Sequence, residues 1–205
     1  IRRPPRSTLS SSSAASDVYK RQILLPGRLT AWKGQEMFLE ALNKVNIQLG
    51  NDAFIAVILG NDQGRDLYKK KLIRLVEQYR LTKQIRFIDH CKNMPLAYKI
   101  SDIVISASIE PEAFGRVSVE AQSMQKMIVA SNLGGSNETV IDGKTGILFE
   151  AGNSDELSEK IIKVMNMDPN EISKMGNNGR ENALKKFNVE KMCFSTYSEY
   201  KKLFN

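Results

Sequence analysis

Short apolar runs alternate with amphipathic stretches from Ile23 onward, and this alternation limits the possible folds more than any other feature of the chain. The runs at 53–59 and 103–105 are apolar at every position, which is typical of strands buried on both faces. The stretch 34–49, which precedes the first of these runs, instead repeats its apolar residues at helical spacing. Strands that are apolar on both faces need cover on both sides, so the pattern predicts a parallel sheet between two helical layers.

The same alternation continues to residue 149, and three further helical patterns close the chain. Strands are expected at 23–26, 53–59, 85–88, 102–107, 127–130 and 146–149. Helices are expected at 34–49, 65–80, 95–101, 115–125, 136–141, 154–165, 169–186 and 189–203. The fold class is therefore α/β: a Rossmann-like parallel sheet of about six strands with helices on both faces, followed by C-terminal helices. Such sheets bind ligands beyond the carboxyl ends of their strands, so the loops there are the candidate sites.

Residues 1–22 differ from the rest of the chain. They contain two prolines, a serine run and no apolar periodicity, so they cannot bury enough surface to offset the entropy of ordering. No apolar segment follows the arginines, which argues against a secretory signal. The string resembles adapter or vector DNA translated onto a truncated gene; a native disordered tail is the alternative. We therefore expect a disordered, non-native segment at 1–22, a domain at 23–205, and a missing N-terminal part of the protein.

The net charge of +7 does not by itself indicate nucleic-acid binding. Residues 1–22 hold five cations and one acid, which leaves only +3 for the remaining 183 residues. We therefore expect no nucleic-acid partner. No apolar run approaches the roughly 20 residues of a membrane span.

Metal and redox sites are also disfavoured by the sequence. His90 is the only histidine, and Cys91 and Cys193 lie far apart, without the spacing of metal ligands. The two cysteines are interpreted as reduced thiols of a cytosolic protein. We expect no metal and no cofactor.

The first candidate loop runs from Gly27 to Gly34, between the first strand and its helix. It carries Arg28 and Lys33 at the helix entrance. A helix N-terminus favours anions, and a guanidinium and an ammonium beside it suit a pyrophosphate. The alternative is two exposed surface cations near a turn.

The second candidate loop follows the fourth strand and leads into the helix that begins at Gly115. Gly115 permits a ligand to approach the backbone, and the next amides point out of the helix start. Glu120 shares the face of the apolar residues around it, where a carboxylate is costly unless something satisfies it. A sugar diol or a salt bridge to a neighbouring cation could do so. Glu112 either contacts a ligand or stabilises the helix start. In the third loop, Gly134 and Gly135 permit a second close approach to a ligand.

The motifs together resemble the C-terminal domain of family-4 glycosyltransferases with the GT-B fold. The resemblance covers about residues 23–188 and rests on the order and spacing of five segments. These are Gly27–Arg28 with Lys33–Gly34, Glu112–Ala113–Phe114–Gly115, Glu120–Ala121, Gly134–Gly135 with Glu138, and Asp142–Gly143–Lys144–Thr145–Gly146. The resemblance implies that this chain is one half of a GT-B fold and binds a nucleotide-diphosphate sugar. Asp89 stands where the family usually has a glycine, which affects the expected base preference.

The resemblance also implies roles for individual residues. Arg28, Lys33 and Glu112 form the catalytic set: the two cations neutralise the donor diphosphate, and the carboxylate contacts the donor sugar. Glu120 accepts the ribose hydroxyls. The other donor-binding positions are expected at Gly27, Gly34, Gly60, Phe87, Asp89, Phe114, Gly115, Arg116, Val117, Gly134 and Gly135.

The function implied is retaining sugar transfer to a cell-surface glycan or lipid-linked acceptor, with this chain as a donor-binding fragment. The acceptor domain would be the missing N-terminal half. A cytoplasmic location with peripheral contact at the inner membrane face is expected. A sugar-nucleotide epimerase or phosphorylase of the same fold, and a non-catalytic nucleotide-binding module, remain as alternatives.

Overall fold

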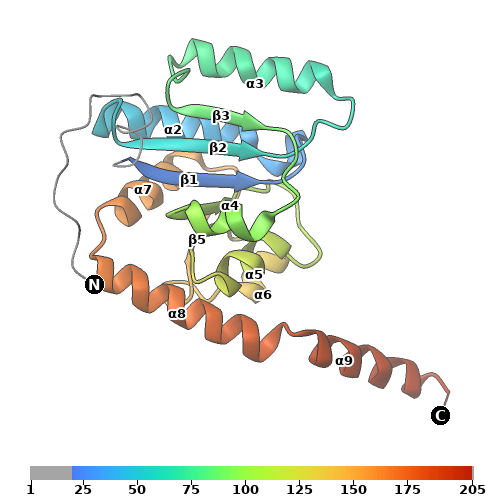
Figure 1. The fold of residues 1–205 in the computed structure, drawn as a ribbon. Coiled ribbons are helices and arrows are strands. Elements are labelled where there is room, and N and C mark those ends of the chain that lie inside the picture. The colour runs from blue at the N-terminus through green and yellow to red at the C-terminus, as the bar shows by residue number, and fades with distance from the viewer. Residues whose placement is uncertain (1–19, 205) are drawn as a thin grey trace.

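A computed structural model describes residues 20–204. Its sheet contains six parallel strands in the order β3-β2-β1-β4-β5-β6 (Figure 1). The strands are β1 (Arg21–Pro26), β2 (Phe54–Leu59), β3 (Ile85–Ile88), β4 (Ile103–Ser106), β5 (Met127–Ser131) and β6 (Ile147–Phe149). The expected parallel, Rossmann-like sheet is therefore confirmed.

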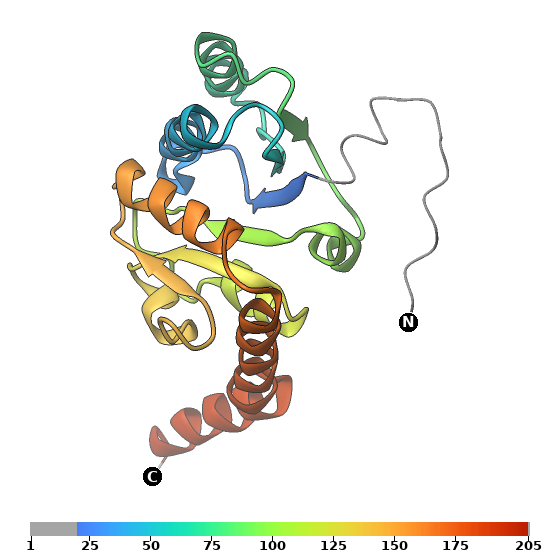
Figure 2. The same cartoon turned by 90° about the vertical axis from the view of Figure 1, so that its left-hand side faces the viewer.

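Helices cover the sheet on both faces (Figures 1 and 2). They are α2 (Gln35–Leu49), α3 (Asp66–Gln78), α4 (Met94–Ile100), α5 (Arg116–Ser123), α6 (Gly135–Thr139), α7 (Ser154–Met165), α8 (Pro169–Lys186) and α9 (Val189–Lys202), with a short 3-10 helix η1 (Ala31–Lys33). The helices α2, α3 and α7 pack on one face of the sheet, and α4 and α5 pack on the other.

Alternate residues of one strand enter opposite cores, which explains why the strands are apolar throughout. Ile23 and Leu25 of β1 pack in the core beneath α2 and α7. Leu24, between them, packs in the second core with Tyr98 of α4 and Ala121 of α5. Each of the three strand residues is less than 5% exposed. The two-sided burial expected from the sequence is thus observed.

The first strand begins earlier than the sequence suggested. Arg21 pairs with Phe54 in the ladder, and the backbone amide of Gln22 donates to the Asp102 carboxylate at 2.7 Å. Two residues that we placed in the non-native segment therefore belong to β1. Polar side chains at a strand end carry no apolar signal, so periodicity did not include them. The prediction for residues 1–19 lies outside the described residues.

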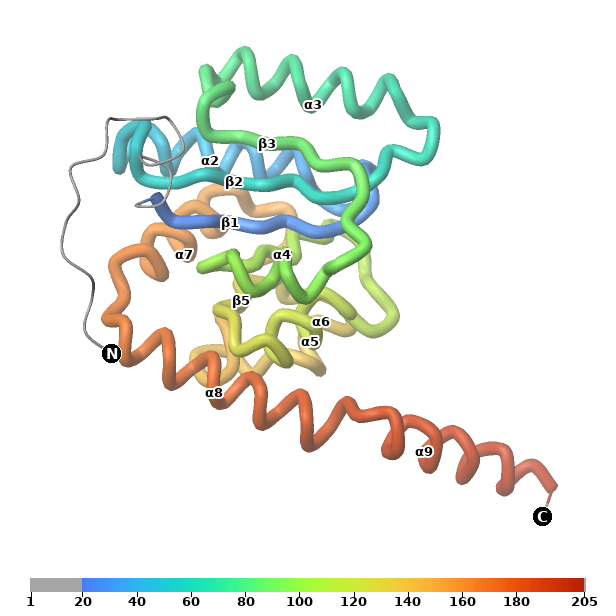
Figure 3. Tube along the Cα trace, in the orientation of Figure 1, coloured from blue at the N-terminus to red at the C-terminus, as the bar shows by residue number. Residues whose placement is uncertain are grey.

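The last two helices behave differently from each other. A methyl group added at Gly176 of α8 would lie 2.5 Å from the Gln125 carbonyl oxygen, so α8 packs closely beside the end of α5. The next helix, α9, extends away from the body of the domain and buries no residue (Figures 2 and 3). Its apolar side chains Met192, Phe194, Tyr197, Tyr200 and Leu203 are exposed. Among residues 20–204, no helix is both long and apolar enough to cross a bilayer.

Candidate functional site

A cleft opens at the carboxyl ends of β1 and β4, where the strand order changes direction. The chain runs outward from β1 to β2 and β3 on one side, and from β4 to β5 and β6 on the other. Loops that follow β1 and β4 therefore diverge and leave a crevice, the usual ligand position in such sheets. The cleft measures about 460 Å³ and is lined by Pro26, Gly27, Arg28, Trp32, Lys33, Met94, Tyr98, Glu112, Ala113, Phe114, Gly115, Arg116, Val117 and Glu120. Nine of the expected site residues are among them.

Glycines without side chains allow the first loop to sit tightly against its neighbours. At Gly34, where φ is 72°, an added methyl group would lie 1.9 Å from the carbonyl oxygen of Ala107, just beyond β4. At Gly60, after β2, it would lie 1.8 Å from the carbonyl oxygen of Gly27. The side-chain amide of Gln35 also donates to the Arg28 carbonyl at 2.8 Å. Gly34 and Gly60 thus shape the loop from behind and do not line the cleft.

An ion pair joins the first and second loops across the switch point. The Lys33 amine lies 2.7 Å from the Glu112 carboxylate, and the two side chains are only 12% and 13% exposed. The amine also lies 4.4 Å from the centre of the Trp32 ring, a cation–π contact. The Ser108 hydroxyl donates to the same carboxylate. Two members of the expected catalytic set are therefore neighbours, with each charge balanced by the other.

Arg28 is an exposed cation of the cleft. Its side chain forms no ion pair with any carboxylate of residues 20–204, in contrast to Lys33. A guanidinium without a protein counterion can accept an anionic ligand without first releasing a carboxylate. The electrostatic character of this side of the cleft therefore favours an anion.

Glu120 faces the cleft from α5, and two protein donors hold its carboxylate. The Tyr98 hydroxyl donates to Oε2 at 2.7 Å, and the Arg116 guanidinium donates to Oε1 at 3.0 Å. The salt bridge considered from the sequence is therefore present, yet about a third of the Glu120 side chain stays exposed. Burial, and then the hydrogen bond to Glu120, raise the pKa of Tyr98, so its hydroxyl stays protonated and acts as a donor.

The start of α5 supplies backbone donors to the same cleft. Gly115 adopts the left-handed conformation at the N-cap, with φ at 75°, and no side chain caps the helix. Amides of the first helical turn have no partner within the helix. Arg116 and Val117 line the cleft at this turn, so the helix start can bind an anion there.

The glycines of the third loop support the second loop. A methyl group added at Gly134 would lie 2.7 Å from the Glu112 amide nitrogen, and one at Gly135 would lie 2.3 Å from the Phe114 carbonyl carbon. The Gly135 amide also donates to the Glu112 carbonyl at 2.7 Å. The paired glycines were expected to let a ligand approach the backbone, whereas the structure places the protein loop bearing Glu112 against them. Neither glycine lines the cleft.

Phe87 and Asp89 also lie outside the cleft lining. Phe87 is half-buried against the core beneath α2 and α3. Asp89 is 60% exposed, and its carboxylate lies 2.6 Å from the Lys69 amine. Sequence reasoning did not single out Tyr98, Trp32 or Ser108, which the structure brings to the site. Each of these contacts joins the residue to a side chain or segment through the tertiary fold or a local turn, and no motif in the sequence marks them.

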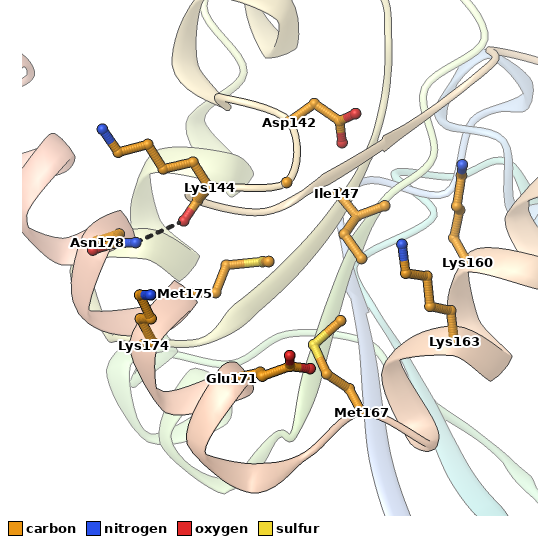
Figure 4. A pocket seen from close by; sticks show the side chains of 11 residues that line it. Asp142, Lys144, Ile147, Lys160, Lys163, Met167, Glu171, Lys174, Met175 and Asn178 are labelled. Carbon is orange, nitrogen blue, oxygen red and sulfur yellow. Dashed lines mark hydrogen bonds between the residues drawn. The ribbon is translucent and has the colours of Figure 1, made fainter.

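A larger hollow, of about 590 Å³, is lined by residues from β6, α7, α8 and the loops beside them (Figure 4). It surrounds Ile147, where β6 begins, together with Met167 and Met175, and four lysines line it. The lysines are Lys144, Lys160, Lys163 and Lys174. Because it lies at the amino ends of the strands, this hollow is remote from the loops that carry the candidate residues. Size alone therefore does not locate the site.

Comparison with known proteins shows which family the chain resembles. The profile of the family described as "Glycosyl transferases group 1" matches residues 9–182. The uncharacterized glycosyltransferase MJ1069 of Methanocaldococcus jannaschii is 32% identical over 189 residues, which cover 90% of this chain and 45% of that protein.

Two solved structures share the fold at significant sequence identity. A glycosyltransferase from Rickettsia africae superposes with a TM-score of 0.85 at 30% identity, over 91% of this chain and 48% of that one. Anabaena Alr3699/HepE, solved in complex with UDP, superposes with a TM-score of 0.83 at 27% identity, over 93% of this chain and 51% of that one. HepE has also been solved with UDP-glucose. The chain spans about half the length of these proteins.

Proposed function

Because this chain belongs to the group 1 glycosyl transferases, we propose that its cleft binds a nucleotide-diphosphate sugar. We further propose that the chain is the donor-binding part of a retaining family-4 enzyme with a GT-B fold. The likeness to HepE, a protein solved with UDP and with UDP-glucose, supports this ligand class. Membership of the family favours sugar transfer over the epimerase and phosphorylase alternatives.

One observation carries the proposal: a single cleft holds an uncompensated guanidinium, an uncapped helix start and a carboxylate. Arg28 and the first turn of α5 favour the negative charge of a diphosphate. Glu120 offers acceptor oxygens to the hydroxyls of a ribose. A nucleotide diphosphate contains both a diphosphate and a ribose, and so matches both kinds of group in the cleft.

The proposed chemistry follows from where charge develops. Breaking the bond between the sugar and the phosphate leaves an oxocarbenium-like sugar and a diphosphate with increased negative charge. Arg28 and Lys33 would stabilise that charge as it forms, without requiring a divalent metal. Glu112 would orient Lys33 through their ion pair and contact hydroxyls of the donor sugar. The acceptor oxygen would form the new bond with retention of the anomeric configuration.

A second domain would complete the enzyme. The chain matches about half of MJ1069 and of the solved relatives, and a GT-B enzyme places its acceptor between two such domains. We propose that the acceptor site and any catalytic histidine come from that other half. The acceptor would be a growing cell-surface glycan or a lipid-linked sugar, reached from the cytoplasm at the inner membrane face.

The proposal is tested by calorimetric titration of the chain with UDP-, GDP- and ADP-sugars. At least one should bind, and Arg28→Ala should weaken that binding about tenfold or more, since hydrogen bonds to charged groups contribute on the order of 1.5–3 kcal/mol. Arg74→Ala, an exposed arginine on α3, is the matched control and should leave affinity unchanged. If the two variants weakened binding equally, the proposal that Arg28 binds the anion in the cleft would be contradicted. In an enzyme with both halves, Arg28→Ala and Lys33→Ala should each lower transfer about 100-fold.

A further inference from the structure

The floor of the cleft contains a buried tyrosine whose hydroxyl reaches a carboxylate on another helix. Tyr98 of α4 is only 2% exposed, and its ring packs in the core shared by α4 and α5. Its hydroxyl lies 2.7 Å from Oε2 of Glu120, 22 residues further along the chain. A buried hydroxyl needs a partner, and here that partner is a group that lines the ligand cleft.

The two donors to Glu120 differ in how firmly they can hold it. Arg116 contacts Oε1 from the same helix, four residues away, and its side chain is 83% exposed. Exposed pairs at this spacing contribute only about 0.3–0.5 kcal/mol, because water screens them and both side chains lose entropy. Tyr98 is fixed by the core around its ring, so its hydroxyl is held in one place. Tyr98 is therefore the donor that sets the carboxylate orientation.

The remaining acceptor capacity of Glu120 matches a pair of hydroxyls. An ionised carboxylate has about four lone-pair positions, two on each oxygen. Tyr98 occupies one position on Oε2 and Arg116 one on Oε1. One position on each oxygen is left, which is the arrangement that two adjacent hydroxyl donors require.

We propose that Tyr98 is a positioning residue that makes the cleft selective for ribonucleotides over 2′-deoxyribonucleotides. This inference rests on the proposed nucleotide site. It acts through Glu120 and does not itself touch the ligand. With Oε2 fixed by Tyr98, both oxygens of the carboxylate face the diol, and the loss of one ligand hydroxyl leaves one acceptor unpaired. Without the tyrosine hydroxyl the carboxylate can turn toward Arg116, and the second hydroxyl no longer matters.

The test compares UDP with 2′-deoxy-UDP by titration calorimetry on the full chain, with GDP and ADP and their 2′-deoxy forms in parallel. The wild-type chain should bind the ribonucleotide about tenfold more tightly, the effect of one hydrogen bond to a charged group. Tyr98→Phe keeps the ring and should reduce this ratio to about one, chiefly by weakening ribonucleotide binding. Tyr68→Phe is the control: it loses a hydroxyl that contacts Gln35 under the other loop, and should retain the ratio.

The outcomes separate this inference from the proposed function. A ratio unchanged in Tyr98→Phe overturns the positioning role while the nucleotide site stands. If the wild-type chain binds a ribonucleotide and its 2′-deoxy form equally, Glu120 does not bind both ribose hydroxyls and the inference fails. Absence of binding to every nucleotide overturns the proposed function and this inference together. Thermal melts of both variants verify that a changed ratio does not come from unfolding.

Discussion

At the level of single residues, the ion pair between Lys33 and Glu112 affects how strongly the cleft can attract an anion. Both side chains are largely withdrawn from water, so solvent and salt screen their attraction less than that of surface pairs. A diphosphate that needs the Lys33 amine must share it with Glu112 or displace the carboxylate. The pair therefore orders the two loops and at the same time lowers the positive potential available to the ligand.

Glu112→Gln should raise the affinity of the chain for free UDP severalfold, because the Lys33 charge is no longer balanced by a carboxylate. The same variant should lower sugar transfer in an enzyme with both halves, because its loop contact to Lys33 and its sugar contact are weakened. Titration calorimetry measures the first effect. Glu110→Gln is the control, since it removes the same charge two residues away at an exposed position. An equal rise in both variants would show a general charge effect and contradict the specific one.

At the level of elements, the glycines hold neighbouring loops together. Four glycines lie against the backbone of another loop or strand end, so closely that an added methyl group would clash. They are Gly34, Gly60, Gly134 and Gly135. The loops after β1, β2, β4 and β5 thus support one another, and the positions of the cleft residues depend on segments that do not touch the ligand.

Gly60→Ala should lower the melting temperature by about 5 °C or more, since its methyl group would lie 1.8 Å from the Gly27 carbonyl oxygen. This corresponds to about 2 kcal/mol for a domain of this size. Nucleotide binding should weaken as well, because Gly27 lies in the cleft. Gly152→Ala is the comparison: φ there is 85° but nothing lies within 4 Å of the added methyl group. If Gly60→Ala lowered the melting temperature less than Gly152→Ala does, the close packing of Gly60 against Gly27 would not be the cause of the destabilisation.

The helix α9 should contribute little to stability in this chain, because none of its residues is buried. Phe194→Ala, at a side chain that is 72% exposed, should change the free energy of unfolding by less than about 0.5 kcal/mol. Phe38→Ala, at a fully buried side chain of α2, should cost about 3–5 kcal/mol. Denaturant melts of the two variants compare them directly. A large loss for Phe194→Ala would mean that α9 packs on a surface in solution.

At the level of the whole molecule, the candidate site occupies only one end of the strands. The cleft lies at the carboxyl ends of the strands, and the hollow with four lysines lies at the amino ends. Cationic groups and helix amides supply the anion-binding capacity of the cleft, so nucleotide binding should be independent of divalent metal. The increase in melting temperature with UDP should be the same in EDTA and in magnesium. A shift that appears only with magnesium would contradict this expectation.

The order of strands and helices and the parallel sheet were determined by the sequence itself. A strand that is apolar at every position requires cover on both faces of the sheet. This signal can be seen within one short segment, such as 53–59. The strand ends then place Arg28, Lys33 and Glu112 on loops, and Glu120 on the helix α5 that follows, at one edge of the sheet, as expected.

The partners of those residues were decided only by the tertiary structure. Tyr98 meets Glu120, Asp89 pairs with Lys69, and Gly135 lies under Phe114 because distant segments fold together. A local pattern records whether a side chain is apolar and how often it recurs. It does not record which residue 20 or more positions away will face it, because that depends on how whole helices pack on the sheet.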